Sequence, residues 1–504
     1  MRLIRAVLAA TLTLIGSAAL SAEISLRDDL RPRLSQLWPI YGEETNTGRN
    51  RPVVLPAGEE DGYYPNGLRI ISVSGVIEPG DAERLAAMIR VAVPVPAFVI
   101  VFDSPGGNFA EGVKIGRLLS HYREGNAAPK LHGAIVLDDA ECMSACAVAF
   151  TLAAKLRDSG RSVRYVEQGA QLGFHMPYVP VDQQDRQTEI VAAMDLTYQI
   201  MSEYIRLIGN GIAPSALVQN ALHYRRPDAF FLLRGGLVTR FMDFVPVAGP
   251  KGGTALALSG LTQRDALNMC QYLTYSQGRD MIAAEYEFWP VDIGSEFPDD
   301  TPLKTLFERY GDRRLANDGC SIEWQQGDTL GIAAFGDCGR RSAGSGWCAA
   351  PRNNNGYTQH RGDLPRATGA LLGDSLGCHG GNLTTRYYRW DAGNRFFEEE
   401  DPEAYSWVGA FYDDAPEAPI LSMDWSGARL ETNLNIRSAP RGDRLARWSE
   451  GTPVEVLDCT LSADGQGVWY QVRSAGQTGW ASARYVEVPA FAGWDLMIRP
   501  VGFE

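Results

Sequence analysis

The sequence predicts an α/β protein in which a largely parallel sheet is followed by an irregular, cysteine-containing middle region and a small all-β barrel. Three observations support this fold class. Apolar, strand-like segments alternate with amphipathic, helix-like segments between residues 67 and 245. Residues 261–425 follow, rich in glycine and aromatic residues, irregular in pattern and with five cysteines. Short strand-like segments separated by turns then occupy residues 428–490, a spacing that suits a small all-β barrel.

The alternation between residues 67 and 245 predicts each element in turn. Strands are expected at 68–77, 97–104 and 130–139, and helices at 79–92, at 108–122 and directly after Ser144. The stretch 161–177 is expected to be extended. Apolar residues from Ile190 to Ile208 recur at steps of three and four, which predicts a long amphipathic helix, and another helix is expected at 213–224.

The remaining boundaries come from length and composition. A chain of 504 residues is expected to form two to four domains. Residues 23–66 are polar and turn-rich and are interpreted as a lead-in segment with little periodicity. The Pro- and Gly-rich stretch 246–260 is interpreted as a linker. No function is predicted for residues 261–425.

The N-terminus has the layout of a secretory signal peptide over residues 1–22. Arg2 and Arg5 precede an apolar run, and the small-residue ending Ala19–Leu20–Ser21–Ala22 follows it. The sequence therefore predicts export across the inner membrane to a periplasmic or extracellular location. An uncleaved N-terminal anchor is the alternative.

Charge and cysteine content narrow the partners. The formal net charge of −14 argues against nucleic acid and against an anionic membrane surface. Eight cysteines in an oxidising compartment favour disulfides, whose connectivity the sequence leaves open. Paired CxxC zinc spacing is absent from the sequence, and the Cys378–His379 pair is interpreted as structural. No metal and no cofactor are expected.

The C-terminal part resembles the bacterial SH3 domain. "LNIRSAP" opens it, "EGTPVEVL" lies centrally, "WYQV" follows and "GQTGWASARYV" closes it. The resemblance implies a module that binds a cell-wall or peptide ligand or holds a partner. Trp469, Tyr470 and Trp480 are interpreted as barrel core, with a role in a ligand groove as the alternative.

Three stretches carry residues suited to amide hydrolysis: "FDSPGGN" (102–108), "CMSACAVAF" (142–150) and "GFHMP" (173–177). Such a reaction needs a nucleophile, a base that takes its proton, and donors for the oxyanion. Ser144 lies at a strand-to-helix turn that exposes its hydroxyl, and His175 ends the next extended segment. Asp228, further along the chain, is a candidate to orient the imidazole.

The expected oxyanion donors are backbone N–H groups. Gly106 and Gly107 follow a buried strand, and without Cβ atoms their N–H groups approach a substrate closely. Ala145, directly after the serine, is the third candidate.

Taken together, these motifs resemble the Clp protease proteolytic subunit family of the ClpP/crotonase superfamily. Ser104–Pro105–Gly106–Gly107, Ser144–Ala145 and His175–Met176–Pro177 match its motifs, and Asp228, before an aromatic strand and Gly236–Leu237, matches its third member. The match covers residues 67–245. It implies a β-β-α spiral fold, a homo-oligomer, and serine endopeptidase chemistry on a peptide or protein substrate. In that family's terms Ser144 is the nucleophile, His175 the general base and Asp228 the orienting residue, with Gly107 and Ala145 as oxyanion donors.

The chain departs from the family in two respects. The spacing from Asp228 to the Gly-Leu element is shortened, which leaves Asp182 and Asp185 as alternative third members. The cytosolic relatives are fed by an ATP-driven unfoldase, and an exported chain meets no ATP. The predicted activity is therefore ATP-independent and limited to small or flexible substrates.

The sequence also allows other interpretations of the nucleophile, of the two cysteines beside Ser144 and of the function. Cys142 or Cys146 is an alternative nucleophile, although an exported thiol tends to be oxidised. A Cys142–Cys146 disulfide would lock the turn, but a bond across consecutive helical turns often violates disulfide geometry, so plain buried residues are the simpler interpretation. The main functional alternative is a catalytically silent scaffold or cell-wall- or peptide-binding protein acting through the SH3-like part. Acyl-CoA chemistry is disfavoured by export.

Overall fold

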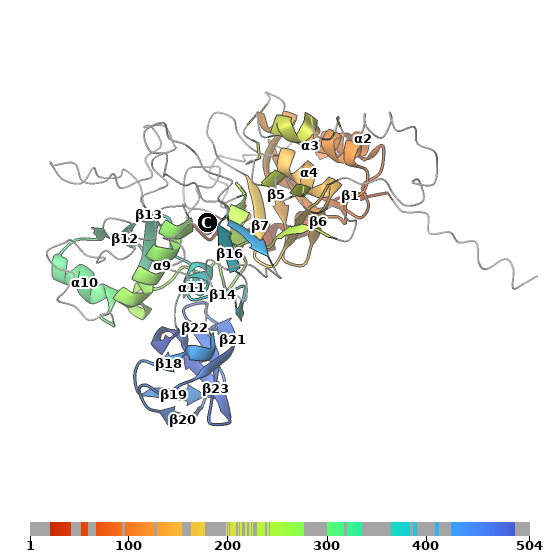
Figure 1. Cartoon of the computed structure of the whole chain (residues 1–504). Helices are drawn as coiled ribbons and strands as arrows, with labels where there is room; N and C mark the ends of the chain where they lie inside the picture. Colours follow the sequence, from red (N-terminus) through yellow and green to blue (C-terminus); the bar gives the residue numbers. More distant parts are fainter. Residues whose placement is uncertain are drawn as a thin grey trace, which may run out of the picture.

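The computed structural model describes the parts of the chain that carry most of the predicted elements (Figure 1). The described residues are 21–41, 52–58, 67–92, 96–124, 129–153, 163–176, 198, 200, 202–207, 210, 212–213, 217–218, 221–222, 224, 229–236, 239–240, 242–276, 300–316, 320–334, 364–383, 387–390, 409–412 and 425–488. Residues 1–20 of the predicted signal peptide, most of the predicted helix up to Ile208, and much of 213–224 lie outside them.

A seven-stranded sheet in the order β1-β3-β4-β5-β7-β10-β2 forms the centre of the N-terminal part. Its parallel strands are β3 (Leu68–Ser74), β4 (Ala97–Asp103), β5 (Lys130–Val136), β7 (Arg164–Glu167) and β10 (Val245–Ala248). The helices α2 (Asp81–Ala92) and α3 (Phe109–Glu124) connect β3 to β4 and β4 to β5. The predicted α/β class with a parallel-rich sheet is confirmed, and these elements lie where the hydrophobic pattern put them.

The lead-in segment contributes more than the sequence suggested. Its strand β1 (Glu23–Leu26) pairs antiparallel with β3, and β2 (Trp38–Pro39) pairs antiparallel with β10. Residues from the lead-in therefore form both edges of the sheet. Strands of four and two residues are too short to leave a readable period, which explains why the sequence pattern missed them.

Part of the predicted linker at 246–260 also forms a strand that the sequence did not predict. It begins inside β10, whose Val247 and Ala248 are 0% and 1% exposed, and continues into the turn η2 (Leu258–Gly260). Pro246 has no N–H to donate in this strand, but its carbonyl accepts from the N–H of Ile40 (3.0 Å). The first three residues of the predicted linker therefore belong to a buried strand.

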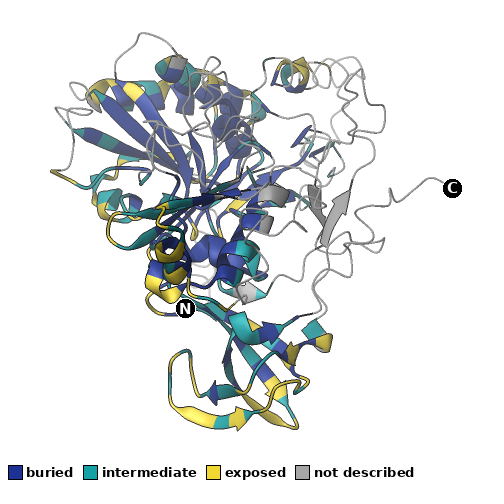
Figure 2. Ribbon diagram, turned by 90° about the vertical axis from the view of Figure 1, so that its left-hand side faces the viewer, coloured by how far each residue is buried: buried dark blue, intermediate teal, exposed yellow. Residues whose placement is uncertain are grey.

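A smaller sheet of three strands lies beside the main one, and Ser144 and His175 directly follow two of its strands. The strands β6 (Glu141–Met143) and β8 (Gln171–Phe174) pair in parallel, and β9 (Phe231–Leu233) pairs antiparallel with β8. The helix α4 (Ala145–Leu152) follows β6 after a single residue, and all eight of its residues are buried. Figure 2 shows buried residues through the strands in the upper part of the view and many exposed residues at its lower end.

The cysteine-containing region is more regular than the sequence predicted. It holds the helices α9 (Gln263–Ser276), α10 (Leu303–Tyr310) and α11 (Gly369–Ser375). The antiparallel strands β11 (Arg314–Ala316), β12 (Cys320–Gln325) and β13 (Thr329–Ala334) pack with them around a second core, and a Cys270–Cys320 disulfide joins α9 to β12. Two further pairs are β14 (Cys378–His379) with β15 (Asn382–Leu383), and β16 (Tyr387–Trp390) with β17 (Gly409–Tyr412).

The C-terminal barrel is built from a five-stranded antiparallel sheet in the order β20-β19-β23-β22-β21. Its strands are β19 (Leu434–Arg437), β20 (Arg444–Trp448), β21 (Glu455–Leu461), β22 (Val468–Ser474) and β23 (Gln477–Ser482). A pair of β18 (Arg429–Leu430) with β24 (Val486–Glu487) closes it. Tyr470 is 1% exposed, as expected for barrel core, whereas Trp469 and Trp480 are half-buried.

No helix among the described residues is both long and apolar enough to cross a membrane.

Candidate active site

Two turns that are separated in sequence are joined by backbone hydrogen bonds at the carboxyl ends of β4 and β6. The N–H of Ser104 donates to the carbonyl of Glu141 (2.6 Å), and the N–H of Met143 donates to the carbonyl of Ser104 (3.0 Å). Ser104 is fully buried at this joint. The "DSPGG" and "CMSAC" stretches are therefore neighbours in the structure.

Ser144 occupies the single position between β6 and α4 in a backbone conformation that favours glycine. Its φ of 53° and ψ of −116° are uncommon for a residue with a Cβ atom. The N–H of Ser144 donates to the carbonyl of Gly173 on β8 (2.9 Å). Its side chain does not cap α4, although a serine before a helix usually does. The hydroxyl is thus left for another partner.

That partner is His175. The side-chain Oγ of Ser144 and Nε2 of His175 are 2.7 Å apart, within hydrogen-bond distance. His175 follows β8 directly and is 4% exposed. Its ring lies 4.5 Å from that of Phe230, and the N–H of Met176, the next residue, donates to the carbonyl of Tyr224 (2.9 Å). The imidazole is fixed on more than one side and faces the serine.

Two residues that support His175 were not assigned roles from the sequence. The hydroxyl of Tyr204 donates to the carbonyl of His175 (3.4 Å), and burial raises the pKa of this phenol, so it stays a neutral donor. Phe230 covers the imidazole ring. The signal for Phe230 was its place beside the aromatic strand after Asp228, but only the fold brings it against the histidine.

The predicted oxyanion donors separate into two groups. The N–H of Gly106 donates to Oγ of Ser104 (3.1 Å), so this group already has an acceptor inside its own turn. The N–H groups of Gly107 and Ala145 have no acceptor within the described part of the chain. Gly107 and Ala145 therefore retain the free donors that an oxyanion requires.

The glycines also let the two turns approach one another. A Cβ atom on Gly106 would lie 2.6 Å from the carbonyl oxygen of Met143 and 2.8 Å from Cβ of Ser144. Gly106 has a φ of 100°, a conformation that glycine adopts without strain. Because Gly106 has no Cβ atom, its turn packs directly against Met143 and Ser144.

The placement of α4 depends on a second pair of glycines that the sequence did not single out. Gly112 and Gly116 lie one helical turn apart on α3, and a Cβ atom at either would meet α4 within 2.5 Å or less, at Ala145 and Leu152 respectively. Isolated glycines in a helical pattern indicate such a close approach. They allow α3 to hold the first turn of α4, and with it the N–H of Ala145.

The third member of the predicted triad is not placed. Asp228 lies outside the described residues, as do its alternatives Asp182 and Asp185.

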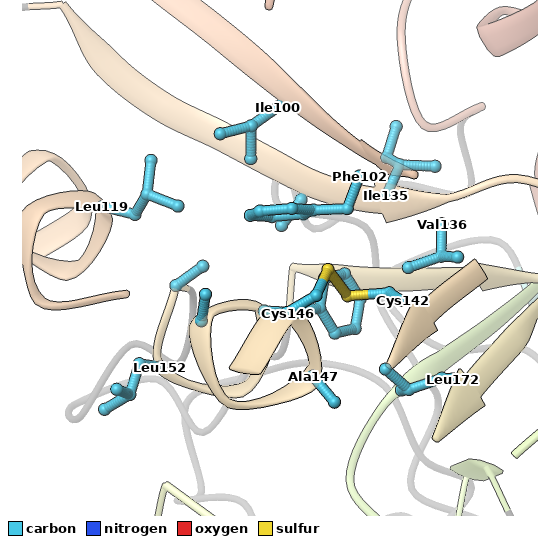
Figure 3. Close-up of a cluster of buried hydrophobic side chains, with 14 of the residues drawn as sticks. Ile100, Phe102, Leu119, Ile135, Val136, Cys142, Cys146, Ala147, Leu152 and Leu172 are labelled. Atoms are coloured by element: carbon cyan, nitrogen blue, oxygen red, sulfur yellow. A yellow bond between two sulfur atoms is a disulfide. The ribbon is translucent and has the colours of Figure 1, made fainter. Parts of the chain in front are cut away.

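The cysteines on either side of the serine form a disulfide, Cys142–Cys146, and both are 0% exposed (Figure 3). The geometric objection to this bond does not apply, because Cys142 lies on β6 and only Cys146 is helical. The turn at Ser144 brings their Cα atoms within 5.1 Å. Neither cysteine is a thiol in this structure, which argues against a cysteine nucleophile here.

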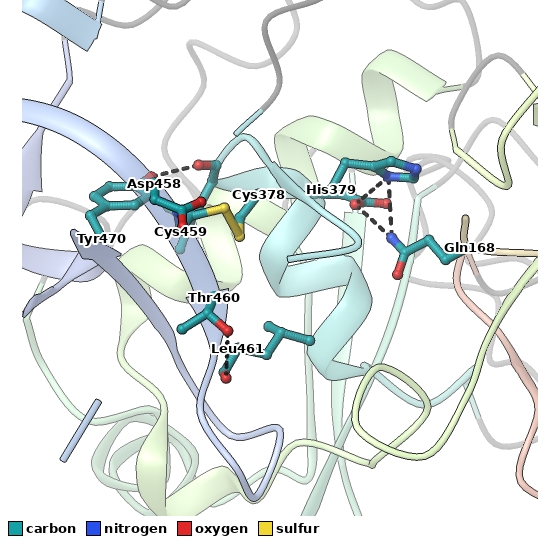
Figure 4. Close-up of a disulfide and its surroundings, with 10 residues drawn as sticks. Gln168, Cys378, His379, Asp458, Cys459, Thr460, Leu461 and Tyr470 are labelled. Carbon is teal, nitrogen blue, oxygen red and sulfur yellow. Dashed lines mark hydrogen bonds and ion pairs between the residues drawn. A yellow bond between two sulfur atoms is a disulfide. The ribbon is translucent and has the colours of Figure 1, made fainter. Parts of the chain in front are cut away.

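The "GCHGG" stretch is structural, as the sequence suggested. Cys378 forms a disulfide with Cys459 of the barrel, and Nδ1 of His379 lies 2.9 Å from Oδ1 of Asp374 (Figure 4). Asp374 also accepts hydrogen bonds from Tyr41 (2.5 Å) and Gln168 (3.0 Å). The described residues contain no group of three or more His, Cys, Asp or Glu side chains suited to a metal ion.

Comparison with known proteins identifies one part of the chain. A family model described as "Bacterial SH3 domain" matches residues 432–487, within the predicted range 428–490. The C-terminal part is a bacterial SH3 domain. Among solved structures, the chain is similar to a ClpP1 mutant from Listeria monocytogenes at 13% identity, covering 35% of this chain and 88% of that one, with a TM-score of 0.26. No curated protein matches the chain.

The bacterial SH3 domain is attached firmly to the cysteine-containing region. Besides the Cys378–Cys459 bond, the hydroxyl of Tyr470 donates to the carbonyl of Leu376 (2.5 Å). The side chain of Gln466 accepts from the N–H of Ala257 (2.6 Å) and donates to the carbonyl of Ala255 (2.8 Å). The SH3 domain thus contacts both the cysteine-containing region and the predicted linker.

A polar cavity of about 690 Å³ lies where the SH3 domain meets the start of α9. Its arginines are already in ion pairs: Arg264 with Glu431, Arg429 with Glu487, and Arg484 with Asp265. Asp300 and Glu450 line it as well, so the cavity carries groups of both charges and does not point to a ligand of one charge.

Proposed function

We propose that this chain is an exported, ATP-independent serine endopeptidase of ClpP-like type that cleaves small or flexible peptides and proteins. The observation that carries the proposal is the 2.7 Å contact between Oγ of Ser144 and Nε2 of His175. It joins a serine that is excluded from helix capping to a histidine held at the end of a strand. The resemblance of the three motifs to the Clp protease proteolytic subunit family, with its β-β-α spiral, supports the same proposal.

The chemistry proposed for these groups is acyl transfer. Oγ of Ser144 attacks the scissile carbonyl carbon while Nε2 of His175 accepts the hydroxyl proton. The N–H groups of Gly107 and Ala145 donate to the oxyanion of the tetrahedral intermediate. His175 then gives the proton to the leaving amine, and water hydrolyses the acyl ester by the reverse sequence. Asp228 is proposed to orient His175.

Two further features support the proposed location. The described cysteines are all paired, in the bonds Cys142–Cys146, Cys270–Cys320 and Cys378–Cys459, and such pairing is typical of oxidising compartments. The sequence pattern of residues 1–22 is that of an export signal. The bacterial SH3 domain is proposed to hold the enzyme at a cell-wall or peptide ligand, and a homo-oligomer is proposed from the family resemblance.

The test is active-site labelling of the full chain with a fluorophosphonate probe. Wild type is expected to label and to cleave unstructured peptides without ATP, and Ser144→Ala is expected to do neither. Ser449→Ala, which changes an exposed serine of the SH3 domain, is the matched control and should label like wild type. Equal labelling of wild type and Ser144→Ala, or no labelling of wild type across pH 5–9, would overturn the proposal in favour of a catalytically silent scaffold that acts through its SH3 domain.

A further inference from the structure

The Cys142–Cys146 disulfide spans the turn that presents Ser144. One sulfur comes from the last strand residues before the turn and the other from the first helical turn after it, so the bond connects the two sides of the serine directly. Both cysteines are fully buried, whereas Ser144 is half-buried. Figure 3 shows the bond among core side chains that include Phe102 and Leu172. It lies on the core side of the turn and is not placed to contact a substrate.

The backbone at Ser144 needs such support. A residue with a Cβ atom at a φ of 53° and a ψ of −116° is disfavoured, and it persists only where the surroundings hold it. The hydrogen bonds from Ser144 to Gly173 and from Met143 to Ser104 hold the strand side. On the helix side, the N–H of Val148 donates to the carbonyl of Ser144 (3.1 Å), and Gly112 lets α3 pack closely against Ala145. The disulfide couples these two sides covalently.

We propose that the Cys142–Cys146 disulfide is a positioning element for Ser144, and that hydrolysis requires it to be oxidised. The bond keeps the strained turn in the conformation that brings Oγ within hydrogen-bond distance of His175. This inference rests on the proposed serine peptidase function. Its consequence is that the chain becomes fully active only after it has reached an oxidising compartment, because there alone the bond forms and stays formed.

The experiment compares two disulfides of the same full-length chain. The variant Cys142→Ala/Cys146→Ala is expected to lose about 10- to 100-fold in kcat and in the fluorophosphonate labelling rate, because a small misplacement of a reacting group has an effect of this size. KM should change little, since the bond lies on the core side. The matched control, Cys378→Ala/Cys459→Ala, removes a buried bond at the SH3 domain and should keep the wild-type kcat, even where its thermal midpoint falls.

The outcomes separate this inference from the function on which it rests. If wild type does not label, the proposed peptidase function fails. If wild type labels and Cys142→Ala/Cys146→Ala has the wild-type kcat, the function stands and the positioning role is wrong. An equal loss of kcat in both double variants would also overturn it, because the effect would then be a general loss of stability.

A second measurement covers the case in which the double variant does not fold. Wild type is equilibrated in dithiol redox buffers, where each disulfide takes two electrons and two protons from the dithiol reductant. The reduced fraction of each bond is read by differential alkylation and peptide mass mapping. Loss of labelling should follow reduction of Cys142–Cys146 and not of Cys378–Cys459. Undiminished labelling after Cys142–Cys146 is reduced would overturn the inference.

Discussion

Two places in this molecule combine the same ingredients, a histidine and a neighbouring disulfide, with different results. At the first, His175 faces the hydroxyl of Ser144 beside the Cys142–Cys146 bond. At the second, His379 faces the carboxylate of Asp374 beside the Cys378–Cys459 bond (Figure 4). Both histidines are held by hydrogen bonds, but only the first faces a nucleophile.

The difference lies in what surrounds each imidazole. Asp374 accepts hydrogen bonds from Tyr41 and Gln168 and lies within hydrogen-bond distance of His379, so this imidazole faces a carboxylate that joins distant parts of the chain. Nε2 of His379 lies 3.2 Å from the carbonyl of Arg234, so the second ring nitrogen is occupied as well. This cluster holds the cysteine-containing region against the N-terminal sheet. At the first place, the N–H of Ala145, the residue directly after the serine, has no acceptor among the residues that the structure describes.

The same substitution at both histidines gives the sharpest test of this contrast. His175→Gln should lower the rate of peptide cleavage by about 10²- to 10⁴-fold, the usual contribution of a general base, with a thermal midpoint near that of wild type. His379→Gln should leave the rate per folded molecule unchanged. It should lower stability by about 1–3 kcal/mol, because the buried carboxylate of Asp374 loses a partner. Steady-state kinetics and thermal unfolding of the two variants measure both effects, and a reversed pattern would show that the roles are assigned the wrong way round.

A glycine substitution tests how closely the two turns of the site must approach. Gly106→Ala introduces a Cβ atom 2.6 Å from the carbonyl oxygen of Met143, so the turn must shift away from Ser144. The labelling rate should fall by about 10- to 100-fold, since a displaced nucleophile reacts slowly.

Gly80→Ala is a well-matched control for this variant. Its φ of 102° is close to the 100° of Gly106, but a Cβ atom there meets nothing within 4 Å. The two alanines therefore share the backbone strain and differ in the clash. Equal labelling rates in Gly106→Ala and Gly80→Ala would mean that the close approach at Met143 has no part in the activity.

A third histidine, His132, faces neither a serine hydroxyl, as His175 does, nor the carboxylate of Asp374, as His379 does. His132 on β5 is 7% exposed, and burial, aided by the charge of Arg123, lowers its pKa to about 4. Between pH 6.5 and about 4 the unfolded chain binds a proton that the folded chain does not. The free energy of unfolding should therefore fall as the pH falls through this window, by roughly 3 kcal/mol at most.

The contribution of His132 to the pH dependence of stability is the difference between wild type and His132→Gln. Unfolding of wild type and of His132→Gln is followed by denaturant titration at pH 7 and at pH 4.5. Stability at pH 7 should be similar or lower in the variant, and its loss between the two pH values should be smaller than in wild type. Parallel pH dependence of the two proteins would show that His132 is not the group responsible.

The sequence alone determined the elements whose pattern is long enough to be read. The buried strands β3, β4 and β5 and the helices α2 and α3 lie where the apolar period predicts them, because each buries one continuous face. It also determined the SH3 domain, through a series of turn and strand motifs. Ser144 and His175 were found for a related reason, since each follows a strand whose end is marked by small or apolar residues.

Only the tertiary structure decided the rest, because the contacts concerned join residues that no local pattern relates. The edge strands β1 and β2 owe their conformation to the strands they pair with, and the first residues of the predicted linker, 246–248, belong to the buried strand β10 for the same reason. The carboxylate of Asp374 and the imidazole of His379 acquire a role through Gln168 and Tyr41, which are far from them in sequence. The N–H of Gly106 has its acceptor in the side chain of Ser104. The Cys142–Cys146 bond forms because a single strained residue turns a strand into a helix between the two cysteines.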